Sequence, residues 1–161
     1  MARPMEVRPG VADDVSAVVP MVAKICALHE KWDPAKYSFL PGTPERYRGW
    51  LTKRADDPRS VFLVADARPK LAGFLIGTVE DELPIYRLKQ YGFIHDLWVE
   101  EDYRHEGIGR QLVMMAVEKF KGMGMEQVRL DTAFPNDAAR KLFGACGFRA
   151  STTEMLLQLP A

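Results

Sequence analysis

The sequence has little of what marks several common classes of protein. Its 161 residues include two cysteines, Cys26 and Cys146, so one disulfide is possible by count but a disulfide framework is not. Neither cysteine belongs to a CxxC motif or lies beside paired histidines, so we expect two reduced thiols and no metal site. No apolar run approaches the roughly 18 residues of a membrane helix, and MARPMEVRPG lacks the apolar stretch of a signal peptide. We therefore expect a cytoplasmic protein without a membrane partner.

Charge of one sign is not in excess either. Lys plus Arg and Asp plus Glu number 22 each, and the formal net charge is zero. A protein whose main partner is nucleic acid normally carries a basic surplus, so the balance argues against such a partner. With 47% apolar and 27% charged residues, the chain has an ordinary globular composition, and its length fits one domain over residues 1–161.

Two well-known phosphate-binding motifs are missing. A dinucleotide-binding fingerprint in the turn at residues 107–112 would need a third glycine where Leu112 stands. A Walker A loop would need a Gly-Lys-Ser/Thr sequence, which the chain does not contain. These absences exclude the Rossmann and P-loop types of nucleotide site.

Hydrophobic periodicity predicts a mixed α/β (α+β) layer fold. Thr43 is predicted to cap a helix that has Pro44 as its first residue, and Pro20 is predicted to kink the helix before it. The expected order is β-α-α-β-β-β-α-β-α-β. The strands are predicted at residues 5–8, 60–65, 71–79, 91–99, 127–133 and 155–159, and the helices at about 13–29, 43–56, 109–122 and 136–147.

The strongest chemical feature is a glycine-bearing turn between a strand and an amphipathic helix. The turn reads Arg104-His105-Glu106-Gly107-Ile108-Gly109-Arg110. Glycines let the backbone approach a ligand closely, and the first N–H groups of a helix are unpaired and favour an anion. The turn is therefore a candidate diphosphate cradle. An ordinary strand-turn-helix connection is the alternative.

A second motif gives the turn its context. Residues 136–139 read Asn-Asp-Ala-Ala, and Leu142-Phe143 and Gly147-Phe148 follow. With both motifs in this order, the chain resembles the GNAT superfamily of N-acetyltransferases over nearly its whole length. The resemblance implies a GNAT-like splayed β-sheet flanked by helices on both faces, and acetyl-CoA as the acyl donor. It implies that the cofactor is bound by Leu97, Trp98, Val99, Arg104, His105, Glu106, Gly107, Ile108, Gly109, Arg110, Asn136 and Phe143.

The resemblance also implies transfer of an acetyl group to a small primary amine. Some amine-acetylating relatives carry a carboxylate where His95 stands, so His95 and Asp96 are the candidate catalytic residues. On strict alternation His95 shares a face with Leu97 and Val99, and Asp96 lies on the other face, unless a bulge intervenes. A purely structural role for His95 and an ordinary ion pair for Asp96 are the alternatives.

One position departs from the family pattern. Many members carry a tyrosine, thought to protonate the leaving thiolate, where this chain has Phe143. Three alternatives stay open: solvent supplies the proton, Cys146 or Tyr103 substitutes, or the chain is a non-catalytic acyl-CoA-binding or regulatory module.

The resemblance also implies that the acceptor pocket is walled by the segment between the first two helices. There Trp32, Tyr37 and Phe39 are the candidate substrate residues, although they could simply pack the helix pair. Residues 79–106 hold eight acidic and three basic side chains, which favours a cationic acceptor. A protein or peptide amine remains the alternative to a small molecule. The chain after Phe148 is short for the two full final strands common in the family that it resembles. The alternatives are a pocket that is open on that side and a homodimer in which a second subunit completes it.

Overall fold

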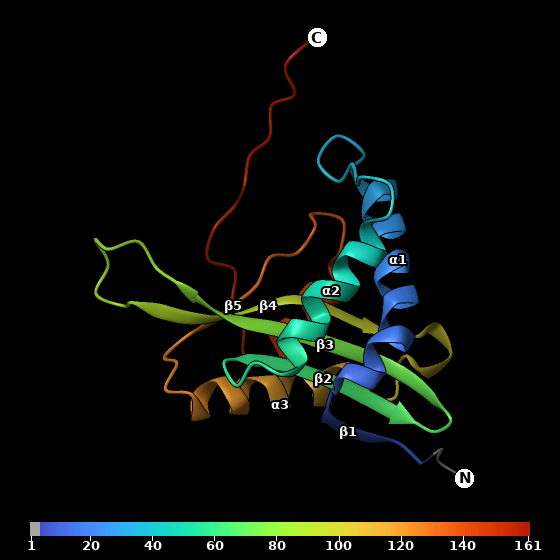
Figure 1. Cartoon of the computed structure of the whole chain (residues 1–161). Helices are drawn as coiled ribbons and strands as arrows, with labels where there is room; N and C mark the ends of the chain where they lie inside the picture. The colour runs from blue at the N-terminus through green and yellow to red at the C-terminus, as the bar shows by residue number, and fades with distance from the viewer. Residues whose placement is uncertain (1–3) are drawn as a thin grey trace.

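The fold is built on one five-stranded sheet. A computed structural model describes residues 4–161, and its strands lie side by side in chain order (Figure 1). Neighbouring strands are antiparallel except the last pair, which is parallel. The strands are β1 (Glu6–Pro9), β2 (Ser60–Ala67), β3 (Lys70–Asp81), β4 (Gln90–Val99) and β5 (Val128–Arg129).

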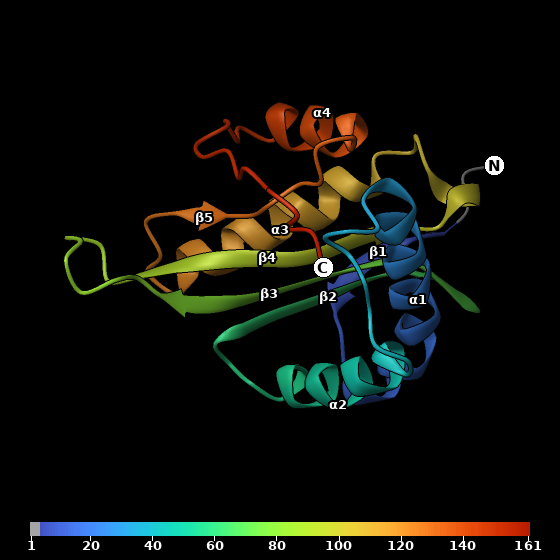
Figure 2. The same ribbon diagram turned by 90° about the horizontal axis from the view of Figure 1, so that it is seen from above.

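Helices cover both faces of this sheet (Figure 2). One face carries α1 (Val15–Trp32) and α2 (Thr43–Ala55), and the other carries α3 (Ile108–Gly122) and α4 (Asp137–Ala145). Short 3-10 turns, η1 (Ala12–Asp14) and η2 (Glu101–Tyr103), precede α1 and follow β4. The predicted mixed fold with helices on both faces is confirmed.

Alternation along the central strands creates two cores. In β2, Leu63 and Ala65 face α3, whereas Phe62 and Val64 face α1 and α2. Each fully buried aliphatic or aromatic side chain contributes about 1.5–3 kcal/mol, so the two cores together hold the layers in place. The largest buried side chains include Leu51, Leu63, Phe74, Leu75, Ile76, Leu112 and Phe120.

Two details of the helices differ from the sequence prediction. Gly42, with φ 76°, is the N-cap of α2, and Thr43 is already its first residue. The Thr43 hydroxyl donates a hydrogen bond backwards to Leu40 O at 2.6 Å, so it does not accept one from the helix. The second helix detail is the end of α1, which contains Pro20 and extends to Trp32, beyond the expected residue 29.

The last predicted strand is wrong. Residues 155–159 have no strand partner, and Met155 and Leu157 are 88% and 83% exposed. β5 is also shorter than predicted, because it spans two residues where seven were expected. A strand forms only against a partner with free N–H and C=O groups, and the period of the side chains cannot supply that partner. Among residues 4–161, no helix is long and apolar enough to cross a membrane.

Candidate active site

A bulge in β4 places two polar side chains on one face of the sheet. Ile76 of β3 is opposite Asp96 and Gly77 is opposite Ile94, so His95 has no partner of its own. Ile94 packs in the core under α3, whereas the His95 ring contacts Trp50 of α2. The bulge that the sequence left open is therefore present, and the extra residue lets His95 and Asp96 both face α2.

Asp96 is held by a tyrosine from α2. The Tyr47 hydroxyl donates a hydrogen bond to Asp96 Oδ2. Burial raises the pKa of Asp96 to about 6, because desolvation disfavours the charged carboxylate. None of the ion pairs found among residues 4–161 includes Asp96. The carboxylate can therefore take up and release a proton near neutral pH.

His95 lies in a ring cluster and touches β3. Its ring is 5.3 Å from the Trp50 ring and 5.0 Å from the Phe93 ring, both edge-to-face. Its Nε2 lies 2.6 Å from Thr78 Oγ1 and 3.5 Å from Glu80 Oε1. Burial lowers the pKa of His95, and the nearby Glu80 carboxylate partly opposes that shift. At neutral pH the imidazole is thus largely uncharged and able to accept a proton.

β4 has a free edge directly after the bulge. Among the described residues, β5 pairs with β4 only at Gly92 and Phe93, and the chain after β5 turns away toward α4 (Figure 2). Glu100 N donates to Ala72 O, and from this bond the antiparallel alternation runs back along β4. Because of this alternation, the N–H and C=O groups of Leu97 and Val99 point to the free edge, and those of Trp98 point toward β3. Of the three residues expected to pair with a cofactor arm, Leu97 and Val99 have groups available on that edge.

The glycine turn forms the N-terminus of α3, as predicted. Gly107 is its N-cap with φ 80°, and His105 also has a positive φ of 64°. The N–H groups of the first helical turn, which begins at Ile108, have no partners within the helix. A Cβ on Gly107 would have no atom within 4 Å, whereas one on Gly109 would lie 3.0 Å from Leu142 Cδ2. The left-handed backbone conformation favours glycine at position 107, and a side chain at position 109 would make a tight contact with Leu142 of α4.

Arg104 folds back onto the end of β4. Its Nε donates to Val99 O at 2.9 Å, and its guanidinium lies 4.8 Å from the centre of the Trp98 ring. Trp98 Nε1 is buried and has no hydrogen-bond partner among residues 4–161. Arg104 thus occupies one of the free-edge acceptors, a contact that the sequence did not suggest.

The second motif forms the start and the buried side of α4. Asn136 is the N-cap, and its Oδ1 accepts from Ala139 N at 3.1 Å, which leaves its amide NH₂ to donate to a ligand. Phe143 is buried, 5.5 Å from the Phe148 ring. Burial raises the pKa of Cys146, and the charge of Arg110 partly opposes this shift. A thiol with a raised pKa stays protonated at neutral pH.

The three candidate substrate residues form a ring cluster with His29 at the end of α1. The His29 ring lies 5.3 Å from Trp32 and 4.8 Å from Tyr37, and Tyr37 stacks on Phe39 at 6.5 Å. These rings pack on one another. The rings that contact His95 are those of Trp50 and Phe93, and Trp50 also touches Tyr47. Sequence reasoning did not select Tyr47 or Trp50, although both lie on the predicted helix at 43–56.

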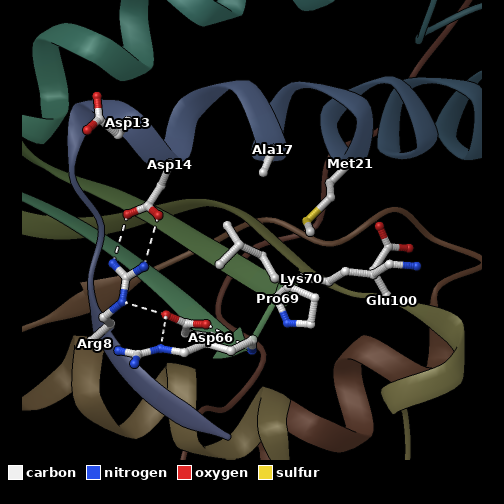
Figure 3. A pocket seen from close by; sticks show the side chains of 11 residues that line it. Arg8, Asp13, Asp14, Ala17, Met21, Asp66, Pro69, Lys70 and Glu100 are labelled. Carbon is white, nitrogen blue, oxygen red and sulfur yellow. Dashed lines mark hydrogen bonds and ion pairs between the residues drawn. The ribbon is translucent and has the colours of Figure 1, made fainter.

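A cavity of about 480 Å³ lies elsewhere, between α1 and the β2–β3 turn (Figure 3). Arg8 donates to both carboxylate oxygens of Asp14, at 2.8 and 2.9 Å, and to Asp66 at 3.1 Å. The Arg8 bond lowers the pKa of Asp14, whereas the pKa of Asp66 is lowered first by the backbone N–H of Arg68 and then by Arg8. The charged groups of the cavity wall thus largely neutralise one another, and the bulge in β4 is the stronger candidate for chemistry.

Comparison with known proteins identifies the family. The sequence model of the family described as "Acetyltransferase (GNAT) family" matches residues 25–148 of this chain. The chain therefore belongs to this family. N-alpha-acetyltransferase 30 of Dictyostelium discoideum is 32% identical over 61% of this chain and 58% of its own length. Phosphinothricin N-acetyltransferase of Streptomyces viridochromogenes is 26% identical over 94% of this chain and 78% of its own. The chain spans about 52–60% of the length of the first curated relatives that it matches.

Solved structures agree on the fold. The tetramutant of a Bacillus halodurans protein superposes with a TM-score of 0.81 at 23% identity, over 96% of this chain and 99% of its own. A GCN5-related N-acetyltransferase from Ralstonia eutropha superposes with a TM-score of 0.73 at 22% identity, over 97% and 99% of the two chains. At these identities the likeness shows the shared fold.

Proposed function

We propose that this GNAT-family chain transfers an acetyl group from acetyl-CoA to a small primary amine. The observation that carries the proposal is the β4 bulge. It sets two proton acceptors, His95 and Asp96, on one face of the strand immediately before the free edge that begins at Leu97. A base beside a surface that can bind an acyl donor is the arrangement that direct transfer to an amine requires.

The residues at the free edge fit an acyl-CoA. Leu97 and Val99 offer backbone groups to the pantetheine amides, as in strand addition, once Arg104 releases Val99 O. The N-terminus of α3 offers unpaired N–H groups to the diphosphate, and the space beside Gly107 is open. The Asn136 amide can donate from α4. When bound, the donor supplies the activated thioester.

The chain's own contribution is to deprotonate and position the amine. A free alkylammonium group has a pKa near 10.4, so at neutral pH a base must take its proton. The pKa of Asp96, about 6, and the lowered pKa of His95 leave both groups ready to accept it. Phe143 offers no proton to the leaving thiolate, and we assign that proton to solvent, since a thiol of pKa about 8.5 is a tolerable leaving group.

The acceptor class is the second part of the proposal. Tyr47, Trp50, Phe93 and His95 form a chain of ring contacts, and carboxylates stand beside it at Asp96 and Glu80. Aromatic faces with nearby carboxylates suit a cationic amine. A peptide amine is the second candidate, because the relatives named above include an N-alpha-acetyltransferase as well as an enzyme for phosphinothricin.

A release assay tests the proposal. Purified protein is incubated with acetyl-CoA and a panel of small amines and peptides with free amino termini, and free thiol is measured. We expect turnover with at least one small amine. Turnover with peptides alone would move the proposal to a peptide acetyltransferase. Thermal stabilisation by CoA without turnover on any acceptor would replace it with a non-catalytic acyl-CoA-binding module.

A further inference from the structure

A pair of β3 side chains lies behind the His95 ring. Thr78 is buried, and its hydroxyl donates to Glu80 Oε1 at 2.5 Å. The same oxygen, Oγ1, lies 2.6 Å from His95 Nε2. Because Thr78 and Glu80 are two residues apart in one strand, both side chains lie on the face that carries His95. The bonds therefore form a continuous chain from imidazole to hydroxyl to carboxylate.

The chain of bonds determines which ring nitrogen carries the hydrogen. A threonine hydroxyl has one hydrogen, and here that hydrogen is directed to Glu80. Toward His95, Thr78 Oγ1 can therefore only accept, and Nε2 must be the donor. In the neutral imidazole the lone pair that can take a proton is then on Nδ1.

From this geometry we propose that Thr78 and Glu80 are positioning residues, which hold His95 with its hydrogen on Nε2 and make Nδ1 the proton acceptor of the reaction. This inference rests on the proposed function. The substrate ammonium gives one proton to His95 Nδ1, and the freed amine lone pair forms the C–N bond as the C–S bond breaks. The second proton passes from the nitrogen to solvent as the amide forms, and solvent protonates the leaving thiolate. Glu80 then faces the imidazolium charge at 3.5 Å.

Other groups around His95 are accounted for. Asp96, next to it in β4, receives the hydrogen of Tyr47 from α2. Trp50 from α2 and Phe93 from β4 contact the ring edge-to-face and bear no charge. Glu80 of β3 is therefore the carboxylate whose removal isolates the effect on His95 Nε2.

Nuclear magnetic resonance tests the inference without any acceptor or acyl donor. The chain has three histidines, and the variants His29→Gln and His105→Gln assign the His95 signals by elimination. We expect the Nε2–H form in the wild-type protein, with a downfield Nε2–H proton protected from exchange. Thr78→Val should abolish that protection, and Thr78→Ser should restore it. A hydrogen on Nδ1, or unchanged protection in Thr78→Val, would overturn the inference.

Kinetics supply the second readout. Glu80→Gln removes the charge that raises the pKa of His95, so the acidic limb of kcat/KM should move to lower pH by roughly 0.5–1 unit. Glu82→Gln is the matched control, because Glu82 pairs with Arg129 and should leave that limb in place. An unmoved limb in Glu80→Gln would contradict the inference. If no acceptor is found at all, the proposed function fails while the resonance test of His95 stands.

Discussion

Two polar clusters pack against the α1/α2 face of the same sheet, and the pKa values of their carboxyl groups are shifted in opposite directions. Near the β2–β3 turn, the Arg8 guanidinium bonds to Asp14 and Asp66, and the pKa of each carboxyl is lowered (Figure 3). At the β4 bulge, Asp96 receives a bond from the neutral Tyr47 hydroxyl, and burial raises its pKa to about 6. The difference separates a structural ion cluster from a site that is suited to move protons.

The comparison teaches that burial of a carboxylate has two outcomes. A guanidinium in contact with the carboxylate stabilises the charged form, and the pKa falls. Without a cation the desolvation penalty dominates, and the pKa rises into the range where the group can exchange protons. A buried carboxylate without a cation beside a binding edge is a candidate for function. A carboxylate paired with a guanidinium mainly supports the fold.

The largest expected effect is on activity at the bulge. His95→Gln keeps a polar side chain and removes the ring nitrogen that accepts the proton, so kcat should fall by about 10²-fold or more. A steady-state assay with the best amine from the acceptor panel measures this loss. Arg8→Gln is the matched control at the other cluster and should leave kcat within about twofold. Full activity of His95→Gln would leave Asp96 as the sole candidate base.

The second effect is on stability at the ion cluster. Arg8→Gln leaves Asp14 without its cation and Asp66 with only the exposed Arg68. Both carboxylates are 11% exposed, so the free energy of unfolding should fall by about 1–3 kcal/mol. The folded pKa values of Asp14 and Asp66 are lowered, so this stabilisation is full above about pH 4 and is lost as the pH falls through the folded values. Urea unfolding at pH 7 and pH 3 measures it. An equal loss at both pH values would contradict the ion-pair explanation.

The third effect has the opposite sign. Because the folded pKa of Asp96 is raised, its charge destabilises the protein increasingly as the pH rises from about 4 to 6. Asp96→Asn should therefore stabilise the protein at pH 7, by up to about 2–3 kcal/mol, and show no gain at pH 4. Thermal unfolding of both proteins across this range provides the comparison. A variant less stable than wild type at pH 7 would indicate that the Tyr47 bond outweighs the desolvation penalty.

The smallest effect is expected at the edge of the ion cluster. Arg68 is 3.6 Å from Asp66, but its side chain is 82% exposed. Exposed ion pairs contribute little, so Arg68→Gln should change the free energy of unfolding by less than about 0.5 kcal/mol. The same urea measurement as for Arg8→Gln checks this. A loss as large as that of Arg8→Gln would show that Arg8, Asp66 and Arg68 act together as one charge network.

Much of the fold could be predicted from local patterns. The glycine turn and the helix after it follow from residues close together in the chain, and the structure places Gly107 at the N-cap of α3. The last strand could not be predicted, since residues 155–159 have the right period but no paired neighbour. Tyr47 and Thr78 could not be predicted as site residues from the sequence. Tyr47 bonds to Asp96, 49 residues away, and Thr78 lies against His95, 17 residues away, and no sequence motif links either pair.

The sequence by itself determined the family, the layered α/β fold and the position of the glycine turn, because short-range motifs and hydrophobic periodicity encode these features. Tertiary structure alone decided that His95 and Asp96 share a face, since a bulge depends on the register of β4 against β3. It also decided the protonation behaviour of the site. Desolvation and hydrogen-bond partners set a pKa, and both come from elements far away in the chain: Tyr47 and Trp50 of α2, and Thr78 and Glu80 of β3.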